Sequence, residues 1–155
     1  MIGKGDLIAV PGGQGQRVLG QAIEVMGGVF LLATFEVGRW DARQLDSIEL
    51  GALVFLVQTM DQAVRDGRWE IVGNRVPDVG IEVPRYLVPV GLGGELFVQD
   101  LYGEIVGPAT AEDVASLAPY KSYSPALVEW ALAARAGAEE WLDRFDEMLA
   151  GSSPS

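Results

Sequence analysis

The chain contains no histidine and no cysteine, which removes two of the side chains most often used in catalysis. Without histidine no side chain has an unperturbed pKa near neutrality, and without cysteine there is neither a thiolate nucleophile nor a soft metal ligand. Serine triads and zinc sites are therefore disfavoured. We expect a binding protein and not an enzyme, with no catalytic residue, no cofactor and no metal site.

Long apolar runs are also missing. The two longest uncharged runs lie between Glu24 and Glu36 and between Glu49 and Asp61, and each is shorter than the roughly 17 to 20 residues that span a bilayer. The N-terminal segment has Lys4, but Pro11 and the glycines after it interrupt any apolar signal core. These features predict a cytoplasmic protein with no membrane partner.

Basic residues are scarce, because 22 carboxylates face only 11 lysines and arginines, for a formal net charge of -11. Nucleic acids and anionic membranes bind proteins through lysine and arginine, so neither is an expected partner. A basic protein is the natural complement of such a chain. The other interpretation is that the surplus carboxylates only keep a domain soluble.

The length of 155 residues suits a single domain, which we place at residues 1–150, followed by a disordered tail at 151–155. Most of the first two thirds is rich in strand-forming residues punctuated by glycine turns. The predicted strands cover residues 7–10, 17–25, 29–35, 52–57, 69–72, 86–90, 95–99 and 104–106. This pattern predicts an antiparallel meander or a partly closed barrel.

The last third is predicted to be helical. Thr110 can cap a short helix that ends by Pro119, and Ser124 followed by Pro125 is a strong helix start. A long amphipathic helix should follow and pack on the sheet through an apolar stripe. The stripe consists of Leu127, Ala131, Ala134, Ala138, Trp141, Phe145 and Met148. The predicted fold class is therefore α+β.

The segment 86–120 has no lysine or arginine and is the strongest candidate for a binding surface. Strand alternation puts Glu95 and Gln99 on one face, and a turn starting at Asp100 would bring Glu104 opposite Gln99. These four residues would form a small acidic plate, unless they are ordinary solvent-facing strand residues. Trp40, in a predicted loop, is a fifth candidate, as an aromatic surface anchor.

Two other functions stay open. Paired carboxylates recur, as at Asp66 and Glu70 or Glu112 and Asp113, and a hydrolase can be built from carboxylates alone. The β-rich part could instead enclose a cavity for a small ligand. Activity towards phosphoesters or glycosides would favour the first alternative, and stabilisation by a small ligand without any protein partner would favour the second.

Several segments together resemble the bacterial immunity protein 26 family. They are residues 4–11 (KGDLIAVP), 19–21 (LGQ) and 68–73 (RWEIVG), with looser likeness at Pro84, at residues 101–103 (LYG) and in the closing helix. Family members often have an aromatic residue and an arginine where this chain has Leu19 and Gln21. The likeness covers most of the chain.

The resemblance implies a small protein that binds and neutralises a cognate toxin domain delivered between bacteria, and it implies no catalytic residues. We expect the acidic surface to cover the active site of the toxin and exclude its substrate. A nuclease, whose cleft is basic, would suit Glu95, Asp100 and Glu104.

Overall fold

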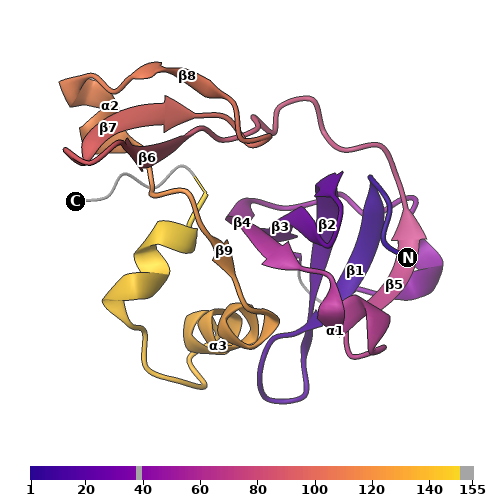
Figure 1. The fold of residues 1–155 in the computed structure, drawn as a ribbon. Helices are drawn as coiled ribbons and strands as arrows, with labels where there is room; N and C mark the ends of the chain where they lie inside the picture. The colour runs from indigo at the N-terminus through magenta and orange to yellow at the C-terminus, as the bar shows by residue number, and fades with distance from the viewer. Residues whose placement is uncertain (38–39, 151–155) are drawn as a thin grey trace. The chain divides into compact units, whose positions relative to one another are not determined.

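The computed structural model describes residues 1–37 and 40–150 (Figure 1). The predicted tail at 151–155 lies outside the described residues. The contacts within the chain form two compact units: a larger unit, Met1–Pro77 with Ser122–Ala150, and a smaller unit, Asp78–Lys121. Strands dominate over helices in this α+β chain, and both sheets are open, so the prediction of a partly closed barrel is wrong.

The larger unit is built on a six-stranded sheet with the order β5-β1-β2-β3-β4-β9. Its strands are β1 (Asp6–Pro11), β2 (Arg17–Met26), β3 (Val29–Phe35), β4 (Leu53–Met60), β5 (Glu70–Asn74) and β9 (Ser122–Tyr123). The predicted antiparallel meander is confirmed, because β1 pairs with β2 and β2 with β3. Gly27, with a φ of 69°, turns the chain between β2 and β3, as expected of glycine in a tight hairpin.

The strand alternation gives this sheet two buried faces. Ile8 and Val10 of β1 point into the main core, whereas Leu7 points to a second cluster with Leu19 and Leu45 on the other face. The segment that supplies Leu45 carries the short 3-10 helix η1 (Ala42–Gln44). It is tied down by Arg75, whose Nη1 donates to the carbonyl oxygens of Leu45 and Ile48 at 3.2 and 2.8 Å.

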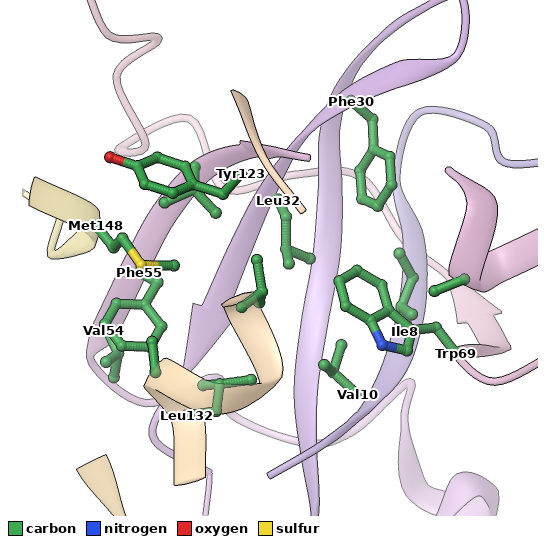
Figure 2. Packing of buried hydrophobic residues seen from close by; sticks show 14 of the residues in the cluster. Ile8, Val10, Phe30, Leu32, Val54, Phe55, Trp69, Tyr123, Leu132 and Met148 are labelled. Atoms are coloured by element: carbon green, nitrogen blue, oxygen red, sulfur yellow. The ribbon is translucent and has the colours of Figure 1, made fainter. Parts of the chain in front are cut away.

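The main core lies between the sheet and the C-terminal part of the chain. Figure 2 shows side chains of the sheet and of the last third of the chain meeting in it. The labelled residues are Ile8, Val10, Phe30, Leu32, Val54, Phe55, Trp69, Tyr123, Leu132 and Met148. Trp69 follows the short helix α1 (Gln62–Arg65) and is fully buried. Burying aromatic and branched side chains on this scale is the main stabilising term of the unit.

The prediction of one long C-terminal helix is wrong. Helix α3 spans Pro125–Arg135, starting where predicted with the Ser124 hydroxyl accepting a hydrogen bond from the Leu127 N–H. It ends at Gly137, whose φ is 84°. The N–H groups of Gly137 and Ala138 donate to the carbonyls of Ala134 and Ala133, which is the Schellman pattern of helix termination.

The far end of the predicted apolar stripe reaches the core by another route. Phe145 and Met148 lie on a separate 3-10 helix, η2 (Asp143–Met148), and both are fully buried. The chain then closes against β4, since the Ala150 N–H donates to the Val54 carbonyl at 2.8 Å. The stripe is thus split between two elements that pack on the same core.

The smaller unit holds a three-stranded antiparallel sheet, β6-β7-β8, and one short helix. The strands are β6 (Tyr86–Val90), β7 (Glu95–Gln99) and β8 (Ile105–Pro108), and the helix is α2 (Ala111–Ser116). The predicted cap is confirmed: Thr110 and Asp113 exchange both hydrogen bonds of a capping box. Across the described residues, no helix is both long and apolar enough to cross a membrane.

Candidate functional site

The smaller unit concentrates unpaired negative charge. It contains seven carboxylates and two basic residues, for a net charge of -5 over residues 78–121. Three of the carboxylates accept local backbone hydrogen bonds: Asp78, Asp100 and Asp113. The remaining four are exposed and, within the described part of the chain, make no ion pair: Glu82, Glu95, Glu104 and Glu112.

The larger unit has fifteen carboxylates and nine basic residues, and at least five of its carboxylates lie in ion pairs. The pairs are Lys4–Glu24, Arg17–Glu70, Arg65–Asp61, Arg68–Glu129 and Arg135–Glu36. Pairing cancels much of the field that these acids would otherwise send into solvent. Per residue, the net charge is therefore more negative in the smaller unit, at -5 over 44 residues, than in the larger unit, at -6 over 106 residues.

The predicted acidic plate does not form as expected. Glu95 is exposed and lies opposite Val90, but Gln99 at the other end of β7 is only 9% exposed. The residue opposite Gln99 on β8 is Ile105 and not Glu104, because the register shifts after Val98. Gln99 is thus a buried residue of the strand, and the prediction that Glu104 faces it is wrong.

Asp100 has a structural role in the turn after β7. Its Oδ1 accepts hydrogen bonds from the backbone N–H groups of Tyr102 and Glu104, both at 2.9 Å. Its own N–H donates to the Glu104 carbonyl, also at 2.9 Å. An aspartate whose side chain accepts a hydrogen bond from the backbone N–H two residues further along is typical of turns. The turn leaves the Glu104 side chain exposed.

Glu95 and Glu104 lie at opposite ends of the hairpin. Five residues of extended chain separate Glu95 from Asp100, the neighbour of Glu104, which corresponds to roughly 15 Å. This exceeds the Debye length of about 8 Å at physiological ionic strength. The two carboxylates therefore act as separate charges and not as one cluster.

Exposed apolar side chains gather beside Glu104. Among the described residues, nine of the fourteen exposed large hydrophobic residues belong to the smaller unit. Three of them follow one another closely: Tyr102 is 60% exposed, Ile105 50% and Val106 51%. We call Tyr102, Glu104, Ile105 and Val106 the hairpin patch.

A β-bulge explains how adjacent residues of one strand are both exposed. Gly107 pairs with Val98 and Ile105 pairs with Gln99, which leaves Val106 as the extra residue of β8. Bulges re-aim side chains in this way and are frequent at sheet edges and binding sites. The sequence reasoning missed these apolar residues, although two successive apolar residues in a short strand cannot both face a core.

Trp40, the fifth predicted residue, lies in the larger unit. Its Nε1–H donates to the backbone carbonyl of Arg17 at 3.1 Å, and the Arg17 guanidinium carbon lies 5.1 Å from the centre of its indole ring. Trp40 also packs against the cluster of Leu7, Leu19 and Leu45. It is half-buried and lines a cavity, whereas the other four predicted residues belong to the smaller unit.

Two of the carboxylates considered for a hydrolase make structural contacts. Glu70 pairs with Arg17, and Asp113 caps α2. Within residues 1–37 and 40–150, no three carboxylates lie close enough to hold a metal ion together.

Comparisons with protein-family models, with curated protein sequences and with solved structures gave no match.

Proposed function

We propose that this protein is an immunity protein: it binds a cognate bacterial toxin domain and blocks the active site, with the hairpin patch as the main contact. The observation that carries this proposal is the combination of exposed apolar side chains and uncompensated carboxylates in the smaller unit. The resemblance of residues 4–11, 19–21 and 68–73 to the immunity protein 26 family supports it independently.

The composition of the hairpin patch suits a protein partner. Interface centres are rich in tyrosine and in apolar side chains, and a rim of charged residues surrounds them. Tyr102 is a candidate hot spot because tyrosine combines a large rigid surface with a polar end. Ile105 and Val106 add apolar area, and Glu104 supplies charge at the edge.

The partner expected from this chemistry is basic. An exposed carboxylate surface attracts a positively charged domain over a distance set by the salt concentration, and it repels nucleic acid and other acidic molecules. Steered association reaches about 10⁸ to 10⁹ M⁻¹ s⁻¹ at low salt. Fast capture suits an inhibitor whose failure would damage its own cell. A nuclease domain fits this description.

The test uses a toxin domain that this protein binds, sought first in the product of the neighbouring gene. Tyr102→Ala should weaken binding by about thirtyfold, the effect of losing a hot-spot side chain. Ile105→Ala should weaken it less, and protection of cells that express the toxin should fall in the same order. Isothermal titration measures the first effect and co-expression the second.

Matched controls come from the larger unit. Ile71 of β5 is also an exposed isoleucine on a strand, so Ile71→Ala makes the same chemical change outside the patch. Glu104→Lys reverses a charge within the patch and should also weaken binding. Glu140→Lys is its control, because it reverses the charge of an exposed glutamate outside the patch. Equal losses in the patch variants and in the controls would contradict the proposed site. Full protection by all of the patch variants would contradict it as well.

A further inference from the structure

The larger unit contains a cavity that the proposed function does not use. Its volume is about 650 Å³, within the range of roughly 300 to 1,000 Å³ typical of small-molecule sites. It lies between the start of β2, the end of β3 and the C-terminal end of α3. Charged and polar residues line it together with apolar ones.

Arg17 is held in place at this cavity by three contacts. Its guanidinium lies over the Trp40 ring, its Nη1 donates to Glu70 Oε2 at 3.0 Å, and its backbone carbonyl accepts the Trp40 Nε1–H. A guanidinium has five N–H donors, so the bond to Glu70 leaves others available. The pair with Glu70 is exposed, with 49% of the Arg17 side chain and 66% of the Glu70 side chain accessible, so the contact with the Trp40 ring is the one that orients the guanidinium.

Arg135 provides a second guanidinium from the last turn of α3. Its Nη2 donates to Glu36 Oε1, and both residues line the cavity. The pair is exposed, with 42% of the Arg135 side chain and 56% of the Glu36 side chain accessible. Exposed ion pairs of this kind contribute about 0 to 1 kcal/mol, so a ligand can share or replace Glu36 at small cost.

The rest of the lining is mixed, with Gln16 and Thr34 as its other polar side chains besides the charged ones. Phe35, Val54 and Leu132 supply apolar wall. Thr34 is 1% exposed and its Oγ1 accepts the Phe55 N–H at 3.2 Å, so its hydroxyl hydrogen is left to donate. The lining thus offers apolar contacts for the apolar part of a ligand and arginine N–H donors for an anionic group on the same ligand.

We propose that this cavity binds a small organic anion with an apolar body, of the aryl or alkyl carboxylate class. Each of the two arginines is paired with a glutamate, Arg17 with Glu70 and Arg135 with Glu36, and among the described residues that line the cavity Glu36 is the one carboxylate, in a chain whose net charge is -11. Arg17 and Arg135 hold the carboxylate, and the apolar wall takes the body of the ligand. This proposal is independent of toxin binding, because it concerns other residues.

The probe is 4-phenylbutyrate, and 4-phenylbutylamine is the matched compound with the opposite head charge. The indole Nε1–H signal of Trp40 in a ¹H–¹⁵N spectrum reports on the cavity, and its loss in Trp40→Phe assigns it. Phenylbutyrate should shift this signal saturably, with a Kd of about 1 mM for so small a ligand. The amine should not.

A double variant and its control decide whether the arginines are responsible. Arg17→Gln with Arg135→Gln should weaken phenylbutyrate binding by at least about tenfold, since charge-assisted hydrogen bonds are lost. Arg43→Gln with Arg65→Gln removes the same charge from residues that do not line the cavity and should leave the Kd unchanged. Equal binding of acid and amine, the absence of a saturable shift, or equal loss in both double variants would overturn the proposal.

Discussion

Replacing Gly137 by alanine distinguishes between two arrangements: the observed end of α3 and the long continuous helix that the sequence pattern predicts. In the middle of a helix, alanine is more stable than glycine by about 1 kcal/mol, so a continuous helix would be stabilised by the substitution. In the structure Gly137 has a φ of 84° and terminates α3. The two arrangements therefore predict free-energy changes of opposite sign.

The expected magnitude follows from the surroundings of Gly137. A Cβ built there would meet no atom within 4 Å, so steric clash adds nothing. What remains is the strain of a left-handed alanine, about 1 to 2 kcal/mol, partly offset by the lower entropy of the unfolded chain. We expect Gly137→Ala to lower the free energy of unfolding by about 1 kcal/mol.

Urea denaturation followed by tryptophan fluorescence is the assay, because all four tryptophans lie in the larger unit: Trp40, Trp69, Trp130 and Trp141. Gly28→Ala is the control, since Gly28 lacks a positive φ and its Cβ would approach Asp61 no closer than 3.9 Å. It should change stability by less than about 0.5 kcal/mol. A stabilised Gly137→Ala variant would refute the helix end described here.

Other substitutions test the packing and the ties of the larger unit by the same assay. Leu32→Ala removes a fully buried side chain and should cost about 2 to 5 kcal/mol; a cost below about 1 kcal/mol would contradict the described core. Arg75→Gln removes the guanidinium donor of the Leu45 and Ile48 carbonyls and should cost about 1 to 3 kcal/mol. An unchanged urea midpoint would mean that Arg75 does not hold this segment. Ser124→Ala removes the cap of α3 and should cost about 1 kcal/mol, with Ser124→Asp restoring most of it if capping is the cause.

The strands were predictable because their local signals agree with their final environment. Residues 86–90 and 95–99 were predicted with the bounds of β6 and β7, and the first three strands within about two residues. Apolar runs of only five to ten residues, rich in β-branched and aromatic side chains and bounded by glycine and proline, favour strands over helices. Local capping chemistry likewise located the starts of α2 and α3, at Thr110 and Ser124.

The end of α3 was missed because the apolar period continues past it. Trp141, Phe145 and Met148 keep three- and four-residue steps with the helix, yet Gly137 lies where a Schellman motif needs a positive φ. The periodicity survives because the 3-10 helix η2 returns Phe145 and Met148 to the same core. Gly137 alone indicates the end of the helix, and the prediction gave too much weight to the apolar periodicity beyond it.

The candidate site was predictable only in part. The deficit of basic residues located the acidic segment, and Glu95 and Glu104 are exposed in it. The burial of Gln99 and the turn contacts of Asp100 depend on register and on a bulge, which strand alternation alone does not specify. Arg17 and Trp40 are 23 residues apart in sequence, and no sequence pattern predicts the contact between them.

Hydrogen–deuterium exchange of the complex with the cognate toxin domain tests the central claim most directly. The proposal predicts that adding the toxin slows amide exchange most strongly at residues 100–108, which hold Tyr102, Glu104 and β8. The same footprint should fade in Tyr102→Ala as affinity falls. Protection confined to the larger unit, in a complex that demonstrably forms, would contradict the claim.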